Sequence, residues 1–207
     1  MPAPKKAAVI TGDVINSSAL EAVARRKMNG ILNRFEKDSA TGLVIQQYRG
    51  DSIQSLLTTR PELALRLGLQ LQSRLMASGF RIRIAIGIGD YSFKGHDIIT
   101  SDGSAFRASG LYLDTLKKTG DIISVAGEDA DFTGEWQTHS ASLNYIVKDW
   151  TALQAEVVDL QLAGYTQQQT ARKLKITQPS VHQRLQAAGW SVIIKIVERF
   201  ESVVPQL

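Results

Sequence analysis

In the N-terminal part of the chain, apolar positions alternate between the period of a strand and the period of a helix. The clearest strand is Arg81–Gly89, in which isoleucine recurs at every second position and would line one face of a sheet. Leucines at helical spacing follow Pro61, a residue that is tolerated in a first helical turn. The predicted order is strand, helix, hairpin, helix, strand, helix, strand, in the segments 7–10, 19–37, 43–58, 61–77, 81–89, 104–118 and 122–125.

This order of elements predicts an α+β fold. The first elements form a ferredoxin-like βαββαβ core, and one further helix and strand extend it. We expect an antiparallel or mixed sheet with its helices on one face. The predicted boundaries are 1–127 for this α+β domain, 128–149 for a helical connector and 150–207 for a small all-α domain.

The all-α domain contains two short helical segments in close succession. Thr166 and Thr177 each precede one of them and are typical N-cap residues, and the connection 175–177 between the two is tight. The pattern over 164–185 resembles the helix-turn-helix of bacterial transcription regulators, which implies that the second of these helices enters the major groove of double-stranded DNA. A last helix, 191–204, has a broad apolar face that either closes the domain or pairs with a second subunit, so we expect a homodimer.

The helix-turn-helix resemblance implies two sets of DNA-binding residues. Residues that would reach base edges are Gln178, Ser180, His182, Gln183 and Gln186, and residues suited to phosphates are Arg172, Lys173, Lys175 and Arg184. The alternative is a helical hairpin used for dimerisation, in which the exposed glutamines are simply solvated.

Charge supports the nucleic-acid interpretation only locally. The chain has 207 residues and a formal net charge of +4, from 24 Lys and Arg against 20 Asp and Glu. The stretch 164–195 contains no acidic residue, so this local asymmetry points to nucleic acid more strongly than the total does.

Composition also excludes several classes of site. The absence of cysteine excludes a disulfide scaffold and a thiolate metal site, and it is compatible with a reducing cytoplasm. No apolar run approaches the length of a membrane span, and the N-terminus does not resemble a signal peptide. We therefore expect a soluble, cytoplasmic protein without membrane contact.

Two aspartates stand where metal chemistry would need them. Asp13 follows the first strand, and Asp51 lies in the predicted hairpin. These strands are neighbours in a βαββαβ sheet, so both carboxylates can converge on one Mg²⁺ that also binds the phosphates of a nucleotide. The alternative is that Asp13 caps the strand end and Asp51 is an ordinary turn residue.

Four segments resemble class III nucleotidyl cyclase domains, in the same order along the chain. They are Val9–Val14, Tyr48–Asp51, Arg81–Gly89 and Gly103–Ser109. Together with the helix-turn-helix, they identify the chain as similar to the SatD-like bacterial family. The resemblance implies that Asp13 and Asp51 are the metal ligands, aided by the main-chain carbonyl of Val14 or Ile15.

The chain departs from the cyclase pattern at the positions that read the base and stabilise the transition state. Gln47 replaces a base-reading lysine, and the second base-reading position falls on Thr100. Arg107 replaces the transition-state asparagine and Leu111 the transition-state arginine. Arg107, like Arg49, could still hold a phosphate.

These departures argue against ordinary adenylyl cyclase activity, because phosphoryl transfer depends on such donors. The favoured hypothesis is a DNA-binding transcriptional regulator whose cyclase-like domain binds a nucleotide or metal, or serves as a dimerisation scaffold. The rival hypothesis is a Mg²⁺-dependent cyclase or nucleotidyltransferase with an accessory helix-turn-helix.

Overall fold

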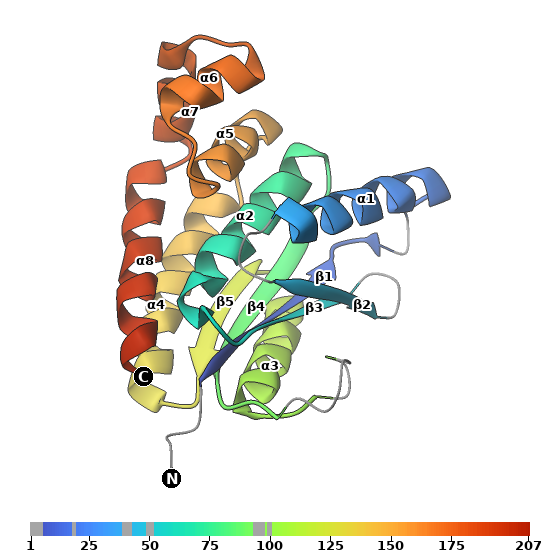
Figure 1. The fold of residues 1–207 in the computed structure, drawn as a ribbon, viewed down its shortest axis with the longest axis vertical. Coiled ribbons are helices and arrows are strands. Elements are labelled where there is room, and N and C mark those ends of the chain that lie inside the picture. Colours follow the sequence, from blue (N-terminus) through green and yellow to red (C-terminus); the bar gives the residue numbers. More distant parts are fainter. Residues whose placement is uncertain (1–5, 18–19, 39–42, 49–51, 93–97, 99–100) are drawn as a thin grey trace.

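A five-stranded sheet forms the centre of the protein (Figure 1). The structure, a computed structural model, describes residues 6–17, 20–38, 43–48, 52–92, 98 and 101–207. The strands are β1 (Ala7–Val14), β2 (Val44–Tyr48), β3 (Ser52–Leu57), β4 (Ile82–Gly89) and β5 (Ile123–Gly127), in the spatial order β2-β3-β1-β4-β5. All neighbours are antiparallel except β4 and β5, which are parallel.

The connections between the strands confirm the ferredoxin-like prediction. Helix α1 (Ala22–Asp38) follows β1, and β2 and β3 form the hairpin. A short 3-10 turn, η2 (Pro61–Leu63), leads into α2 (Ala64–Ala77) and then β4. The fold is therefore α+β with a βαββαβ core, extended by α3 (Ser104–Thr119) and β5.

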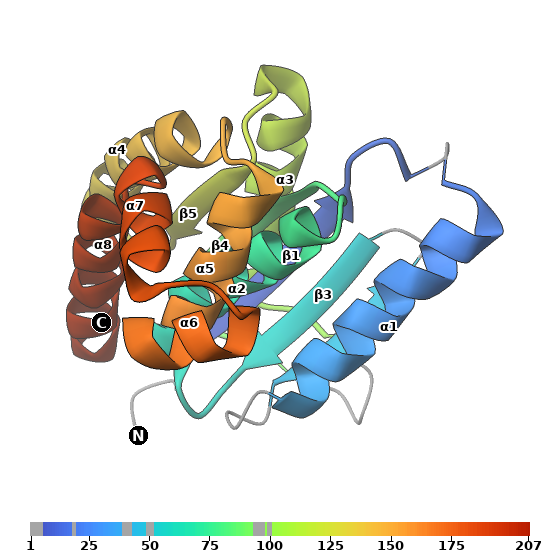
Figure 2. The same cartoon turned by 90° about the horizontal axis from the view of Figure 1, so that it is seen from above.

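The helices cover both faces of the sheet, so the prediction of helices on one face is wrong. Ile84 and Ile86 of β4 pack towards α2, which approaches closely at Gly68. Ala85 packs against α3 on the opposite face, and at Gly87 any Cβ atom would collide with the α3 backbone. Figure 2 shows α1 and α3 on opposite sides of the sheet. Small residues alternate with isoleucine along β4, and the small residues leave room for α3 to pack on the second face of the sheet.

Helix α4 (Ala130–Val147) closes one edge of the sheet with its side chains. The Asn144 side-chain oxygen accepts hydrogen bonds from the N–H groups of Ile122 and Ile123, both at 2.9 Å, and its amide donates to the Ile123 carbonyl. The Ser140 hydroxyl accepts from the Val125 N–H at 3.0 Å. A helix thus satisfies backbone groups that an exposed edge strand would leave unpaired.

Four further helices complete the chain and pack onto the α+β part. They are α5 (Ala152–Leu162), α6 (Gln167–Leu174), α7 (Gln178–Ala187) and α8 (Trp190–Val203), followed by a 3-10 turn, η3 (Val204–Gln206). The Trp136 ring of α4 meets the Phe200 ring of α8 edge-on, with centroids 4.9 Å apart. One apolar cluster runs from the sheet into these helices, and the division at residues 127 and 149 stays a prediction.

Helices α6 and α7 lie at the end of the molecule that is farthest from the sheet (Figure 1). Within the described ranges, no helix has the length and apolar character needed to cross a bilayer.

Candidate functional site

The α6–turn–α7 unit is held by local hydrogen bonds that confirm the predicted caps. The Thr166 hydroxyl accepts from the Gln169 N–H, and the Gln169 side chain accepts from the Thr166 N–H in return, the reciprocal pattern of a capping box. The Thr177 hydroxyl accepts from the Ser180 N–H at the start of α7. Both helices therefore begin where the sequence predicts.

The turn between the two helices is closed by the backbone at Lys175. This residue adopts a left-handed conformation with φ of 54°, and the next N–H, of Ile176, bonds to the Ala171 carbonyl at 3.0 Å. Ala171 is buried between the helices, as are Val181 and Leu185 of α7. The two helices thus pack on α5 through a small apolar corner.

Replacing Lys175 by glycine is expected to stabilise the protein by about 1 kcal/mol, because glycine adopts a left-handed conformation without the steric cost that a Cβ atom brings. Equilibrium urea unfolding measures the difference. The matched control is Lys195→Gly in the interior of α8, which should destabilise the protein by a similar amount. A loss of stability in the Lys175 variant would contradict the prediction.

One face of α7 carries polar side chains that point away from the protein. Gln178, His182, Gln183 and Gln186 are all exposed, and Gln183 lies opposite the buried Val181. None of these four side chains hydrogen-bonds or forms an ion pair with another residue that the structure describes. Of the predicted base-reading set, Ser180 alone is partly used, since its hydroxyl lies 2.8 Å from that of Thr177.

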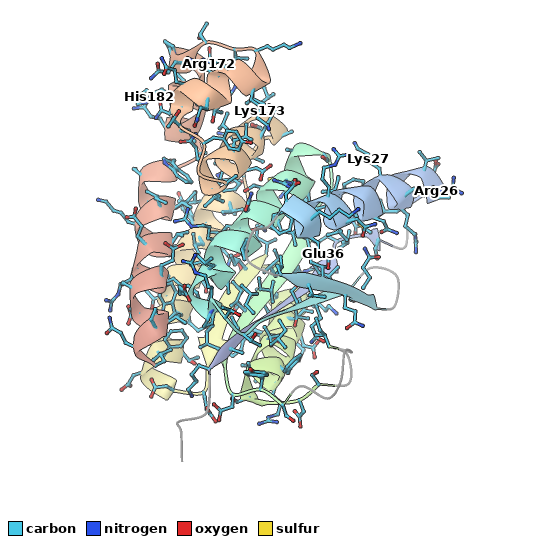
Figure 3. The ribbon with its side chains drawn as sticks, viewed as in Figure 1. Arg26, Lys27, Glu36, Arg172, Lys173 and His182 are labelled. Atoms are coloured by element: carbon cyan, nitrogen blue, oxygen red, sulfur yellow. The ribbon has the colours of Figure 1, made fainter. Side chains whose placement is uncertain are left out.

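The four cations predicted to bind phosphates separate into two groups, and Figure 3 labels one member of each, Arg172 and Lys173. Arg172 and Lys175 are exposed. Lys173 instead lies beside Tyr165, with its Nζ 3.2 Å from the phenolic oxygen and 4.8 Å from the ring centre. Arg184 is half-buried and lies 3.7 Å from a carboxylate oxygen of Glu156 on α5. Arg172 and Lys175 are therefore the two cations whose exposed side chains best suit the predicted binding of DNA phosphates.

Asp13 lies at the end of β1 with two cations beside its carboxylate. An Arg83 guanidinium nitrogen is 3.4 Å from one oxygen, and Lys117 Nζ is 3.8 Å from the other. The Val14 side chain is buried in the core, and Asp51 lies outside the described residues.

The Mg²⁺ site predicted at Asp13 and Asp51 stays a prediction, because of these two residues only Asp13 is described by the structure. Of the side chains that the structure describes, the two in ion pairs with Asp13 are positive, and positive charge disfavours a nearby Mg²⁺. In the part of the chain that the structure covers, no group of three or more His, Cys, Asp or Glu could hold a metal. The described residues therefore supply no step through a bound metal.

Of the residues predicted to bind a nucleotide, the structure describes Gln47 and Arg107, and neither is in contact with Asp13. Gln47 pairs with Ile53 across the ladder and Asp13 pairs with Ser52, so Gln47 and Asp13 face opposite sides of the sheet. Arg107 is exposed and lies 2.9 Å from Asp102 in an ion pair. Arg49 and Thr100 lie outside the described residues.

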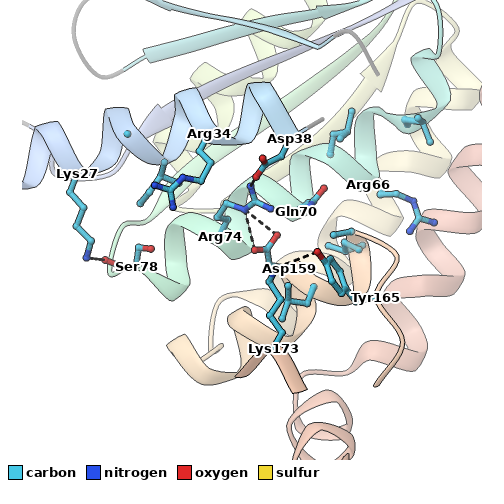
Figure 4. Close-up of a pocket in the computed structure, with 17 residues that line it drawn as sticks. Lys27, Arg34, Asp38, Arg66, Gln70, Arg74, Ser78, Asp159, Tyr165 and Lys173 are labelled. Carbon is cyan, nitrogen blue, oxygen red and sulfur yellow. Dashed lines mark hydrogen bonds and ion pairs between the residues drawn. The ribbon is translucent and has the colours of Figure 1, made fainter. Parts of the chain in front are cut away.

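Sequence reasoning missed a second set of cations, which line a groove between α1, α2 and the α5–α6 region (Figure 4). Lys27 and Arg34 come from α1, Arg66 and Arg74 from α2, and Lys173 from α6. On each of α1 and α2 the basic residues lie about two helical turns apart, on one side of the helix. That spacing indicates from the sequence that each helix has a basic side, although it does not show which helices face each other.

The profile of the SatD family matches residues 7–203, which is nearly the whole chain. The chain belongs to the SatD family. The match includes both the sheet and helices α5–α8, so the family spans the two parts together.

Three solved structures are similar to part of this SatD-family chain. The active GGEEF domain of a diguanylate cyclase from Vibrio cholerae is 17% identical, with 60% of this chain and 84% of that chain covered and a TM-score of 0.45. A bacterial light-regulated adenylyl cyclase is 13% identical, with 61% and 44% covered and a TM-score of 0.42. The adenylyl cyclase CyaB from P. aeruginosa is 18% identical, with 59% and 76% covered and a TM-score of 0.41. No curated protein sequence matches the chain.

Proposed function

We propose that this SatD-family protein binds double-stranded DNA through α7 and acts as a transcriptional regulator. The observation that carries the proposal is the outward face of α7, where Gln178, His182, Gln183 and Gln186 are exposed on a helix whose other face is fixed in an apolar core. Side chains held in this way on a rigid helix can reach base edges in the major groove.

The charge around α7 supports the same proposal. No acidic residue occurs between 164 and 195, so no carboxylate of this stretch opposes the approach of a phosphate backbone. Arg172 and Lys175 are exposed next to the turn, where they can neutralise phosphates beside the groove. Helix-turn-helix proteins usually read paired half-sites as dimers, so the proposal includes a homodimer.

Base reading by α7 is tested with a duplex selected from a random-sequence 30-bp pool by the unmodified protein. Gln183→Ala combined with Gln186→Ala is expected to weaken binding of that duplex by about a hundredfold, because each bidentate glutamine contact contributes about 1–3 kcal/mol. Fluorescence anisotropy measures the affinity. Gln47→Ala removes an equally exposed glutamine from β2 and is the matched control.

The proposal fails if the pool yields no enriched duplex, or if the double variant binds the enriched duplex as tightly as the parent does.

Phosphate contacts are tested separately with Arg172→Ala. This variant should bind all duplexes more weakly and lower the slope of log K against log salt by about 1, since one counterion-releasing contact is lost. The glutamine variants should leave that slope unchanged.

A further inference from the structure

The groove between α1, α2 and the α5–α6 region encloses about 1100 Å³ and is open to solvent (Figure 4). Small-molecule sites in proteins are typically clefts of about 300–1,000 Å³, so this groove is large enough for a metabolite of nucleotide size. Its walls come from both parts of the protein, the α+β domain on one side and the helices that lead into the helix-turn-helix on the other.

The charge in the groove is strongly positive. Among the described residues that line it, five are cations and two, Asp38 and Asp159, carry carboxylates. Arg74 uses both carboxylates, at 3.1 Å from each. Arg66 is paired with Glu201 of α8 at 2.6 Å. Of the five cations, Arg74 is paired with carboxylates that line the groove and Arg66 with one outside it.

None of the other three cations forms an ion pair with a carboxylate among the described residues, although Lys173 is near enough to Asp159 to lower the pKa of that carboxyl. Lys27 Nζ donates to the Ser78 carbonyl at 3.1 Å, and Lys173 Nζ donates to the Tyr165 hydroxyl. The exposed Arg34 side chain makes no ion pair or hydrogen bond within the ranges that the structure covers. Because like charges repel, three such cations around one groove favour a bound polyanion.

The groove also has an apolar wall beside these charges. Ile31 of α1, Leu67 of α2 and Leu160 of α5 line it. A purely inorganic anion would leave this apolar surface in contact with water, whereas a ligand with a ring would cover it. The combination of cations and apolar wall therefore suits a phosphorylated molecule with a flat or apolar body.

We infer that this groove binds a nucleotide-class ligand, with Lys27, Arg34 and Lys173 facing its phosphates and the apolar wall facing its ring. The arginine fork suits phosphate oxygens because it donates two parallel hydrogen bonds. This site lies on the α1–α2 side of the sheet, whereas Asp13 faces α3, so the two are separate.

A ligand in this groove would contact α1 and α2 together with Lys173 of α6 and Asp159 of α5. It would therefore favour one placement of the α5–α6 region relative to the sheet, which is the requirement for coupling between two sites. This regulatory role rests on the proposed DNA binding. The ligand site itself does not, since its occupancy can be measured without DNA.

The test is isothermal titration of the full chain with ATP, GTP, inorganic tripolyphosphate and adenosine, without DNA. We expect a nucleoside triphosphate to bind more tightly than tripolyphosphate or adenosine. Arg34→Ala should weaken its binding about tenfold, because a charge-assisted hydrogen bond is lost. The matched control is Arg26→Ala, which removes an exposed arginine of α1 that does not line the groove and should leave binding unchanged.

A second variant should change the affinity for nucleotide in the opposite direction. Asp38→Asn removes a carboxylate from the groove and releases Arg74 from one of its two partners, so nucleotide binding should strengthen. The inference is overturned if neither nucleotide binds, if tripolyphosphate binds as tightly as both, or if Arg26→Ala weakens binding as much as Arg34→Ala does. Binding of nucleotide by a protein that selects no duplex would leave this site intact and refute only the DNA proposal.

Discussion

Replacing Asn144 by leucine is expected to destabilise the protein by at least about 3 kcal/mol. Leucine has a similar volume but no polar group, so three buried backbone groups of β5 and its approach would lose their partners: the N–H groups of Ile122 and Ile123 and the Ile123 carbonyl. Each buried group left without a partner costs about 1–3 kcal/mol. Equilibrium denaturant unfolding measures the loss.

The neighbouring residue provides the control for this prediction. Tyr145 is exposed on the same helix, and Tyr145→Ala should change stability by less than about 1 kcal/mol, as exposed substitutions usually do. Hydrogen exchange adds a local readout, since the Ile123 amide should exchange faster in the Asn144 variant. Equal stability of the Asn144 and Tyr145 variants would show that the side-chain cap of the sheet edge contributes little.

Replacing Arg74 by alanine is expected to destabilise the protein by about 3–5 kcal/mol, the usual cost of leaving one member of a buried ion pair alone. The Asp159 side chain is only 14% exposed, and Arg74 lies 3.1 Å from it. Without the guanidinium, the carboxylate would remain buried at the contact between α5 and α2. Denaturant unfolding at neutral pH measures the effect.

A double variant distinguishes the uncompensated charge from lost packing. Asp159→Asn alone should cost less than Arg74→Ala, because Arg74 keeps its ion pair with Asp38 at 3.1 Å. Combined with Arg74→Ala, it should recover most of the lost stability. If the double variant is as unstable as Arg74→Ala, the loss comes from the contact of the Arg74 guanidinium with the Phe35 ring, 5.0 Å from its centre.

The pH dependence of the same pair has a definite sign. Burial raises the pKa of the Asp159 carboxyl above its ordinary value of 3.8, and the attraction of Arg74 offsets only part of that rise. A raised pKa in the folded state means that the group stabilises folding below pH 3.8 and that this contribution is lost as the pH rises through the folded pKa. Relative to Asp159→Asn, the parent should therefore lose stability on passing from acid to neutral pH.

Features that depend on neighbouring residues in the chain could be predicted from the sequence. The alternation of isoleucine in β4 gave the correct strand, and Thr166 and Thr177 cap the helices that they precede. The βαββαβ order followed from the succession of such elements. In each case the interaction spans only a few residues, so the sequence contains all of it.

Features that depend on tertiary contacts could not be predicted in the same way. Arg83 and Lys117 reach Asp13 from β4 and α3, and neither is adjacent to it in sequence. Arg184 is of a residue type that suits phosphate binding, but its guanidinium lies near the carboxylate of Glu156. The groove requires α1, α2 and α5 to be placed together, and its basic spacing becomes meaningful only once they are.

The ion pair between Arg66 and Glu201 has a consequence for synthesis of the protein. Its members are separated by 135 residues, and helix α8, which carries Glu201, is made after the sheet and α2. Because domains generally fold from the N-terminus during translation, the sheet can form first and present α2 as a surface for the later helices. On a ribosome stalled before residue 201, α2 would lack its partner in α8, and resistance of α8 to protease should appear only after that residue has emerged.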